Sequence, residues 1–157
     1  NGTAAGAGVS LAAVGDYVIA SETASFTSAY TAANLSPDGG ASYMLPRLIG
    51  ERRAKEFMLT NRKLTAVEAK EWGLINEVAS VDDFLPAAEK MAQRFAQGAT
   101  QAFGSVKELL SSSFRESLEK QLELEARAIT RNACSKDGIE GVTAFLEKRR
   151  PNFSGNP

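Results

Sequence analysis

The 157-residue sequence contains no histidine. Unless another chain supplies the group, this excludes a Ser-His-Asp triad, a Cys-His dyad and any metal site built on imidazole. Cysteine is almost absent as well, because Cys134 stands alone. A disulfide within the chain and a cysteine-rich metal site are therefore excluded. We interpret Cys134 as a structural residue at a helix end.

Long apolar runs and a strong net charge are also missing. No stretch approaches the roughly 20 apolar residues of a membrane span, and no secretory signal is visible. The formal net charge is −1, which gives no global field to attract nucleic acid or an anionic membrane. We therefore expect neither nucleic acid nor a membrane as a partner. We also expect the protein to lie in the cytoplasm. The sequence opens inside a Gly/Ala-rich turn, so we expect a further N-terminal segment before Asn1.

What is present is the composition of a globular domain, with 43% hydrophobic and 24% charged residues. Short strands are expected at 16–20, 24–26 and 74–78, and helices at 9–14, 40–48, 51–59 and 65–72. Thr65 and Glu68 have the spacing of a capping box. From about Val81 the pattern is helical, at 82–97, 99–133 and 136–149. We therefore divide the chain into an α/β part, 1–79, and a helical part, 80–157.

The small residues 1–8, Asn-Gly-Thr-Ala-Ala-Gly-Ala-Gly, leave backbone N–H groups unshielded at the start of a predicted helix. Such groups can hold an oxyanion, and the N–H of Ala7 is the candidate donor. Close packing of a helix on a strand is the alternative interpretation. A dinucleotide-binding loop is poorly supported, because Leu11 stands where the third glycine of that motif belongs.

Asp38 lies in the turn Ser36-Pro37-Asp38-Gly39-Gly40, also at a predicted helix start. An aspartate there commonly caps the helix. The other interpretation is a general base, which rigid and small neighbours would present to a ligand. Apolar residues nearby, Leu35 and Leu45 among them, favour this second interpretation.

Several ordered segments resemble the crotonase (enoyl-CoA hydratase/isomerase) superfamily, in particular its isomerase-like branch. They are residues 1–12, 35–40, 45–54, 59–78 and 137–151, so the resemblance extends over essentially the whole chain. It implies an α/β fold with a crotonase-like spiral of ββα units, N-terminally incomplete here, and a helical trimerisation region. The chain would be the C-terminal portion of the usual family sequence, with 1–79 in the spiral and 80–157 in the oligomerisation region.

The resemblance also assigns roles to single residues. Ala7 falls at the second oxyanion-hole N–H and Asp38 at the single acid/base of several isomerases. The two glutamates of the hydratases fall at Ser10 and Tyr30, so simple hydration is not expected. The substrate pocket would involve Ala5, Gly6, Tyr30, Ala32, Leu35 and Pro37. Phe145 and Lys148 resemble a pair that contacts the adenosine of coenzyme A, with an ordinary amphipathic helix as the alternative.

The implied activity is an acyl-CoA isomerase of fatty acid metabolism that converts a 3-enoyl-CoA to a 2-enoyl-CoA. It would need no metal and no cofactor beyond the coenzyme A of its substrate, and would assemble as a homotrimer or a dimer of trimers. Other crotonase-type enzymes remain open: a ring-epoxide isomerase, a hydratase or an aromatic acyl-CoA dehalogenase. A non-catalytic oligomerising fragment is the alternative outside enzyme chemistry.

Overall fold

The computed structural model describes residues 1–155 and mixes helices with short strands. The chain forms two compact units, Asn1–Lys90 and Met91–Pro157. Helix α5 (Phe84–Ala96) crosses the boundary between them. None of the described helices combines the length and apolar character that a membrane crossing requires.

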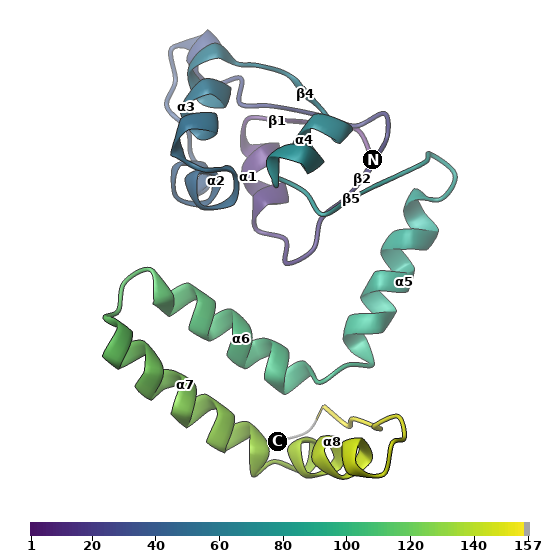
Figure 1. Ribbon diagram of the computed structural model, residues 1–157. Coiled ribbons are helices and arrows are strands. Elements are labelled where there is room, and N and C mark those ends of the chain that lie inside the picture. The colour runs from purple at the N-terminus through teal and green to yellow at the C-terminus, as the bar shows by residue number, and fades with distance from the viewer. Residues whose placement is uncertain (156–157) are drawn as a thin grey trace. The chain divides into compact units, whose positions relative to one another are not determined.

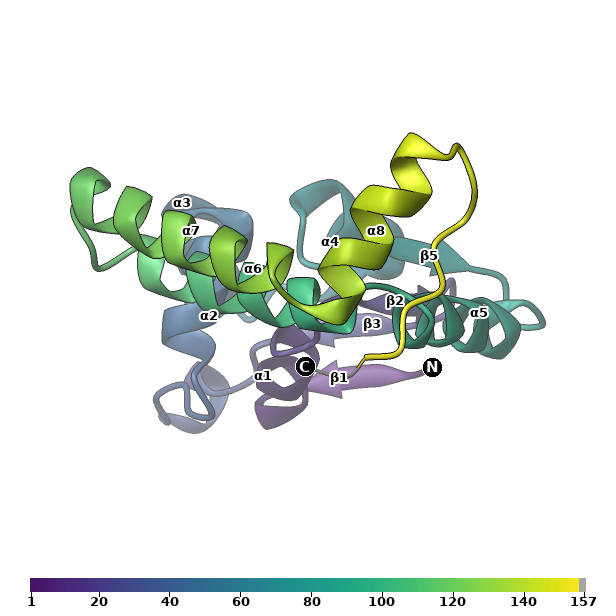
Figure 2. The same cartoon turned by 90° about the horizontal axis from the view of Figure 1, so that it is seen from below.

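The first unit contains two small sheets (Figure 1). In one, β1 (Thr3–Ala5) pairs in parallel with β3 (Ser25–Thr27), which pairs antiparallel with β4 (Leu64–Thr65). In the other, β2 (Ile19–Ser21) and β5 (Glu77–Ala79) are parallel. The pairing of β1 with β3 is also visible in Figure 2. It places the end of β1 beside the segment that leads to Tyr30.

Helices pack around these strands and enclose the core of the first unit. They are α1 (Ala7–Ala13), the 3-10 helix η1 (Thr31–Ala33), α2 (Ala41–Ile49), α3 (Glu51–Thr60) and α4 (Ala66–Trp72). Val9, Leu45, Phe57 and Leu64 are its largest fully buried side chains. Removal of their apolar surface from water is the main force that holds α1, α2 and α3 together.

The predicted capping box is confirmed at the start of α4. The Thr65 hydroxyl accepts the Glu68 N–H at 3.2 Å, and the Glu68 carboxylate accepts the Thr65 N–H at 2.8 Å. The Thr65 N–H first, and the Arg62 guanidinium second, lower the pKa of Glu68 to about 2. The carboxylate is therefore charged at neutral pH, where it also favours the positive end of the helix dipole.

The second unit is built from α6 (Thr100–Ser113), α7 (Leu118–Ala133) and α8 (Lys136–Leu146). The predicted breaks near Gly98 and Ser135 are confirmed, but the single helix expected over 99–133 is wrong. The chain leaves helical geometry after Ser113, and the Ser117 hydroxyl begins α7 by accepting the Lys120 N–H. This break lets α6 and α7 lie side by side (Figure 1).

Two carboxylates of α8 hold the segment that follows it. Asp137 is buried and accepts the backbone N–H groups of Ser154 and Gly155, each at 2.8 Å. Glu140 accepts two bonds from the Arg149 guanidinium, at 2.6 and 2.8 Å. The Ser154 N–H lowers the pKa of Asp137, and Arg149 lowers the pKa of Glu140 to about 2. Both carboxylates are therefore charged at neutral pH.

Candidate functional site

The turn from β1 into α1 depends on Gly6. Its φ of 53° and ψ of −123° are accessible to glycine but strained for residues with a side chain. The Gly6 N–H donates to the Thr27 carbonyl at 3.1 Å and so extends the pairing of β1 with β3. The helix starts directly at Ala7, two residues earlier than expected. As its first residue, the exposed Ala7 has no intrahelical acceptor for its N–H.

Asp38 is not the cap of the helix that follows it. The N-cap of α2 is Gly40, and no side chain there makes a capping hydrogen bond. The Asp38 carboxylate instead accepts a hydrogen bond from the Tyr30 hydroxyl, with 2.6 Å between Oδ1 and the phenol oxygen. This length is typical of a bond to an ionised acceptor. The interpretation of Asp38 as a side-chain helix cap is therefore wrong.

The backbone of Asp38 is fixed on both sides. Its carbonyl oxygen accepts the Ala41 N–H at 3.1 Å and the Ser10 hydroxyl at 3.0 Å. Ser10 is buried on α1, so this bond ties the turn to the helix that Ala7 begins. The next residue, Gly39, has a φ of 57°, and a Cβ there would lie 3.0 Å from the Ser10 Cβ. A side chain at Gly39 would disturb this contact.

Tyr30 is held by its own backbone. Its N–H donates to the Ser28 carbonyl at 2.8 Å, and its carbonyl accepts the N–H groups of Ala33 and Leu35, each at 3.0 Å. Ala29, just before it, has a φ of 60°, a left-handed conformation that costs about 1–2 kcal/mol for a residue with a Cβ. The half-buried ring lies near Gly6, since a Cβ on Gly6 would be 3.7 Å from the Tyr30 Cζ.

The structure therefore brings four positions together: Gly6, Ser10, Tyr30 and Asp38. The remaining candidates of the first unit flank them. Ala5 is the last residue of β1, Ala32 belongs to η1, and Leu35 and Pro37 lie between η1 and Asp38. The 3-10 helix is anchored to the end of α3, because the Thr31 hydroxyl donates to the Met58 carbonyl at 3.0 Å.

Phe145 and Lys148 belong to the second unit. Phe145, near the end of α8, is 82% exposed, and the exposed Lys148 has a φ of 55° just beyond the helix. The Lys148 N–H donates to the Phe145 carbonyl at 3.2 Å. The pair therefore shares one helix end, where both side chains are exposed.

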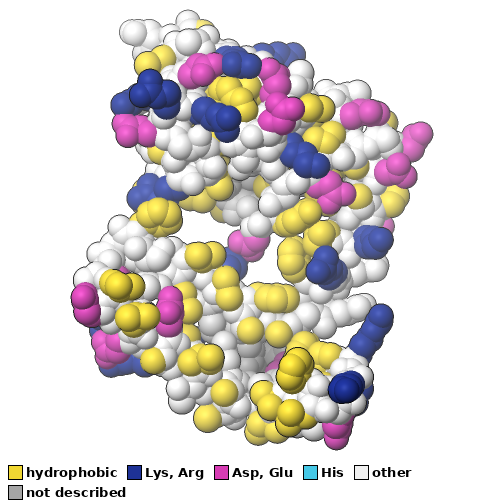
Figure 3. Space-filling model, viewed as in Figure 1, with side chains coloured by type: hydrophobic (Ala, Val, Ile, Leu, Met, Phe, Trp, Pro, Cys, Tyr) yellow, Lys and Arg dark blue, Asp and Glu magenta, His cyan; other side chains and the backbone are white. Residues whose placement is uncertain are grey.

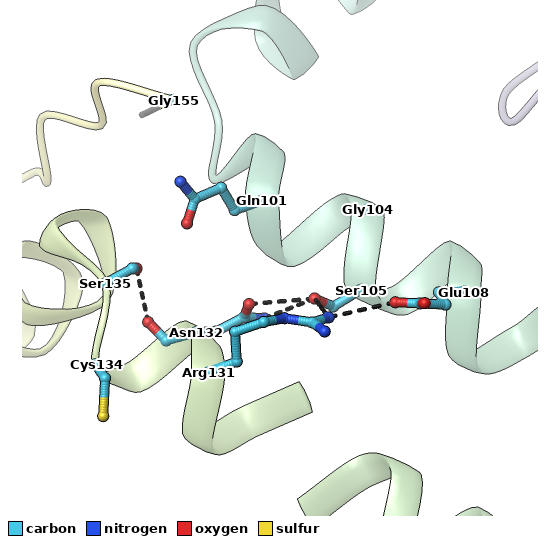
Figure 4. Close-up of a pocket in the computed structure, with 9 residues that line it drawn as sticks. All are labelled: Gln101, Gly104, Ser105, Glu108, Arg131, Asn132, Cys134, Ser135 and Gly155. Carbon is cyan, nitrogen blue, oxygen red and sulfur yellow. Dashed lines mark hydrogen bonds and ion pairs between the residues drawn. The ribbon is translucent and has the colours of Figure 1, made fainter. Parts of the chain in front are cut away.

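A cavity of about 530 Å³ lies in the second unit, between α6, the end of α7 and Gly155 (Figure 4). Arg131 and Asn132 point across it to Ser105, and Arg131 also contacts Glu108 at 3.2 Å. These contacts link α6 to α7. No residue predicted to be functional lines this cavity, and we assign its polar residues to helix packing.

Sequence reasoning missed two features of the site. It did not identify the Ser10 hydroxyl as a support of the Asp38 backbone, and it treated Tyr30 as a pocket wall rather than as a partner of Asp38. Both residues carry a hydroxyl group within segments of small and apolar residues. This polarity is the signal that could have indicated a hydrogen-bonding role.

Comparison with known proteins shows the family of the chain. The family model described as enoyl-CoA hydratase/isomerase matches residues 1–156. The chain is 39% identical over 155 residues to the 1,2-epoxyphenylacetyl-CoA isomerase of Escherichia coli (strain K12), covering 99% of this chain and 59% of that protein. It is 31% identical to the trans-2-decenoyl-(acyl-carrier-protein) isomerase of Streptococcus mutans, and the match covers 99% of this chain and 59% of that protein.

A solved structure shows the same fold. The crystal structure of an enoyl-CoA hydratase from Polaromonas sp. JS666 superposes with a TM-score of 0.91 at 39% sequence identity, covering 97% of this chain and 59% of that one. The chain thus spans about 60% of the length of these relatives. With the α/β architecture and the match over 1–156, these findings place the chain in the crotonase, or enoyl-CoA hydratase/isomerase, family.

Proposed function

We propose that the protein is an acyl-CoA isomerase that converts a 3-enoyl-CoA to a 2-enoyl-CoA. The observation that carries this proposal is the carboxylate of Asp38, held by Tyr30 in the neighbourhood of Gly6, the residue before Ala7. A carboxylate is a suitable base for an acidic carbon next to a thioester. A backbone N–H at a helix start is a suitable donor to the oxygen that becomes negative.

In the proposed reaction Asp38 removes a proton from C2 of the substrate. The electron pair of the broken C–H bond moves to form a dienolate, whose negative thioester oxygen is stabilised by the Ala7 N–H. Asp38 then returns the proton to C4, so the double bond moves from C3–C4 to C2–C3. One proton leaves and one returns, which requires no metal and no redox cofactor. Coenzyme A enters as part of the substrate.

Ala5, Gly6, Ala32, Leu35 and Pro37 are proposed to shape the acyl pocket around this base. Small or apolar side chains suit the lining of such a pocket, and Leu35 is exposed in this chain. Phe145 and Lys148 are proposed to contact the adenosine part of coenzyme A, by stacking and by charge respectively. The exposure of both residues supports a ligand-binding role over a packing role.

A ring-epoxide isomerase is the second candidate. It is favoured by the identity of 39% to the 1,2-epoxyphenylacetyl-CoA isomerase. The double-bond reaction is favoured by the similarity to the trans-2-decenoyl thioester isomerase. The two candidates differ in the substrate, so parallel assays with a 3-enoyl-CoA and an aromatic epoxide acyl-CoA distinguish them.

We further propose that the protein assembles as a homotrimer or a dimer of trimers through its second unit. Apolar side chains are exposed over this unit to an extent unusual for a surface that faces only water (Figure 3). Burial of these side chains against other copies would supply the driving force for assembly.

Asp38→Asn tests the proposed chemistry directly. The amide retains the size of the side chain but cannot accept the C2 proton, so we expect turnover of 3-enoyl-CoA to fall by at least about 10³-fold. Chromatography of the acyl-CoA products measures it in the full natural protein. Asp16→Asn, a surface change in the same unit, is the matched control. Retention of the wild-type rate by Asp38→Asn would overturn the mechanism.

A further inference from the structure

The two oxygens of the Asp38 carboxylate have different surroundings. Oδ1 accepts the Tyr30 hydroxyl at 2.6 Å. Within residues 1–155, no hydrogen bond or ion pair engages Oδ2. One oxygen is therefore anchored and the other is available to a ligand.

Both ends of the anchoring bond are fixed to the backbone of the first unit. At one end, the Asp38 carbonyl is held by Ser10 of α1 and by the N–H of Ala41. At the other end, the Tyr30 carbonyl accepts two N–H groups, and its N–H donates to the carbonyl of the buried Ser28. The hydroxyl is thus presented to Asp38 by a rigid ring with few rotatable bonds. Such a contact restricts the rotation of the carboxylate.

We propose that Tyr30 is a positioning residue that holds Asp38 so that Oδ2 carries the proton. This inference rests on the isomerase function proposed above. A proton taken from one carbon and returned to another two bonds away requires a base that reaches both carbons without turning. With Oδ1 anchored, Oδ2 can serve both ends of the shift from one position.

The anchoring bond also changes during the reaction. While Asp38 is ionised, the bond to Tyr30 is assisted by the negative charge. When Oδ2 takes the proton, Oδ1 becomes part of a neutral carboxylic acid and the bond weakens. The Tyr30 hydroxyl therefore opposes removal of the C2 proton and favours its return to C4, so the benefit to the rate comes from positioning of the carboxylate. Tyr30 keeps its own proton throughout, so the shuttle stays balanced.

Tyr30→Phe tests this role, because it removes the hydroxyl and keeps the ring. In the full natural protein we expect kcat for 3-enoyl-CoA to fall about 10- to 100-fold, because displacement of a reacting group by about 1 Å can lower the rate about 10²-fold. KM should change less than about twofold, since the pocket wall is retained. Tyr17→Phe is the matched control, because its hydroxyl also donates to a carboxylate, that of Glu77 at 3.1 Å, outside the site. It should keep the wild-type kcat.

A second comparison separates positioning from a general structural role. In an Asp38→Asn background, measured at high enzyme concentration, Tyr30→Phe should cause no further loss, because it acts only through the carboxylate. An equal loss in both backgrounds, or an unchanged kcat in the single variant, would overturn the positioning role while leaving the isomerase assignment intact. Absence of turnover by the wild-type protein would overturn the isomerase assignment itself, and the positioning role with it.

Discussion

Ser10 and Tyr30 occupy the two positions at which the family resemblance places the glutamates of the hydratases, and in this chain both side chains contact Asp38. Ser10 donates to its carbonyl and Tyr30 to its carboxylate. Neither is an acid that could activate water, and both instead restrain one nearby carboxylate. At the scale of single residues, these contacts therefore converge on one carboxylate, that of Asp38.

The residues of this site were predictable from sequence to different degrees. Asp38 was a candidate because it lies in a Pro/Gly turn, and Ala7 was a candidate because it lies in a run of small residues before a predicted helix. The contact of Tyr30 with Asp38 was not predicted, and the backbone just before Tyr30 is left-handed at Ala29, a conformation that alanine rarely adopts. Local propensity therefore identified Asp38 as a candidate base but did not identify Tyr30 as its hydrogen-bond partner.

The backbone N–H of Ala7 can be removed by a single substitution. Proline lacks this hydrogen and is well tolerated at the first position of a helix, so Ala7→Pro should leave α1 intact. We expect kcat for 3-enoyl-CoA to fall about 10²-fold, the effect of losing one oxyanion donor. Ala7→Ser retains the N–H and serves as the control. Equal rates for the proline and serine variants would exclude this N–H from the reaction.

At the scale of elements, the sequence predicted helices better than their interruptions. The capping box at Thr65 is confirmed because both of its bonds are local and depend on a fixed spacing. The break between α6 and α7 was missed, because Ser117 resembles any other polar residue within a helical pattern. It acts as a cap only once α7 turns back to pack against α6. The two-residue strand β4 was likewise missed, since it exists only by pairing with β3.

The corner between α7 and α8 requires a residue without a side chain at Gly138. A Cβ at this position would lie 2.0 Å from the Asn132 carbonyl oxygen, a backbone atom that cannot easily move. We expect Gly138→Ala to lower the free energy of unfolding by about 3 kcal/mol, the upper end of the usual cost of overpacking. Thermal or urea unfolding, followed by circular dichroism, measures the change.

Gly104, in the middle of α6, provides the matched control. A Cβ there meets no atom within 4 Å, so Gly104→Ala gains the helix propensity of alanine without a clash. It should raise the free energy of unfolding by about 0.5–1 kcal/mol. The same glycine-to-alanine substitution is thus expected to lower the free energy of unfolding at one position and to raise it at the other. A stable Gly138→Ala variant would mean that the corner between α7 and α8 is less tightly packed than described.

At the scale of the whole molecule, the two units differ in how well they bury their apolar residues. The first unit encloses a core around Phe57 and Leu64. In the second, of residues 91–155, the buried apolar residues are Ala128 and Ala144, both small, while large side chains are exposed along all three helices. The exposed group on α7 includes Leu122, 54% exposed, and Ile129, 70% exposed. Because the two are seven residues apart, they lie on one face of the helix.

This face provides the test of assembly. If it is covered by other copies, Ile129→Glu combined with Leu122→Glu would bury two carboxylates in an apolar interface, at a cost far above what the contacts return. We expect the wild-type protein to sediment at three or six times its protomer mass and the double variant to sediment as a monomer. Thermal unfolding of the isolated protomer should change little, because both side chains are exposed in it.

Thr130→Glu is the control for this test, because it adds a carboxylate at a neighbouring, polar position of the same helix and should keep the assembly. Sedimentation of the wild-type protein as a monomer at micromolar concentration would contradict assembly through the second unit. An unchanged double variant would instead place the interface on another face.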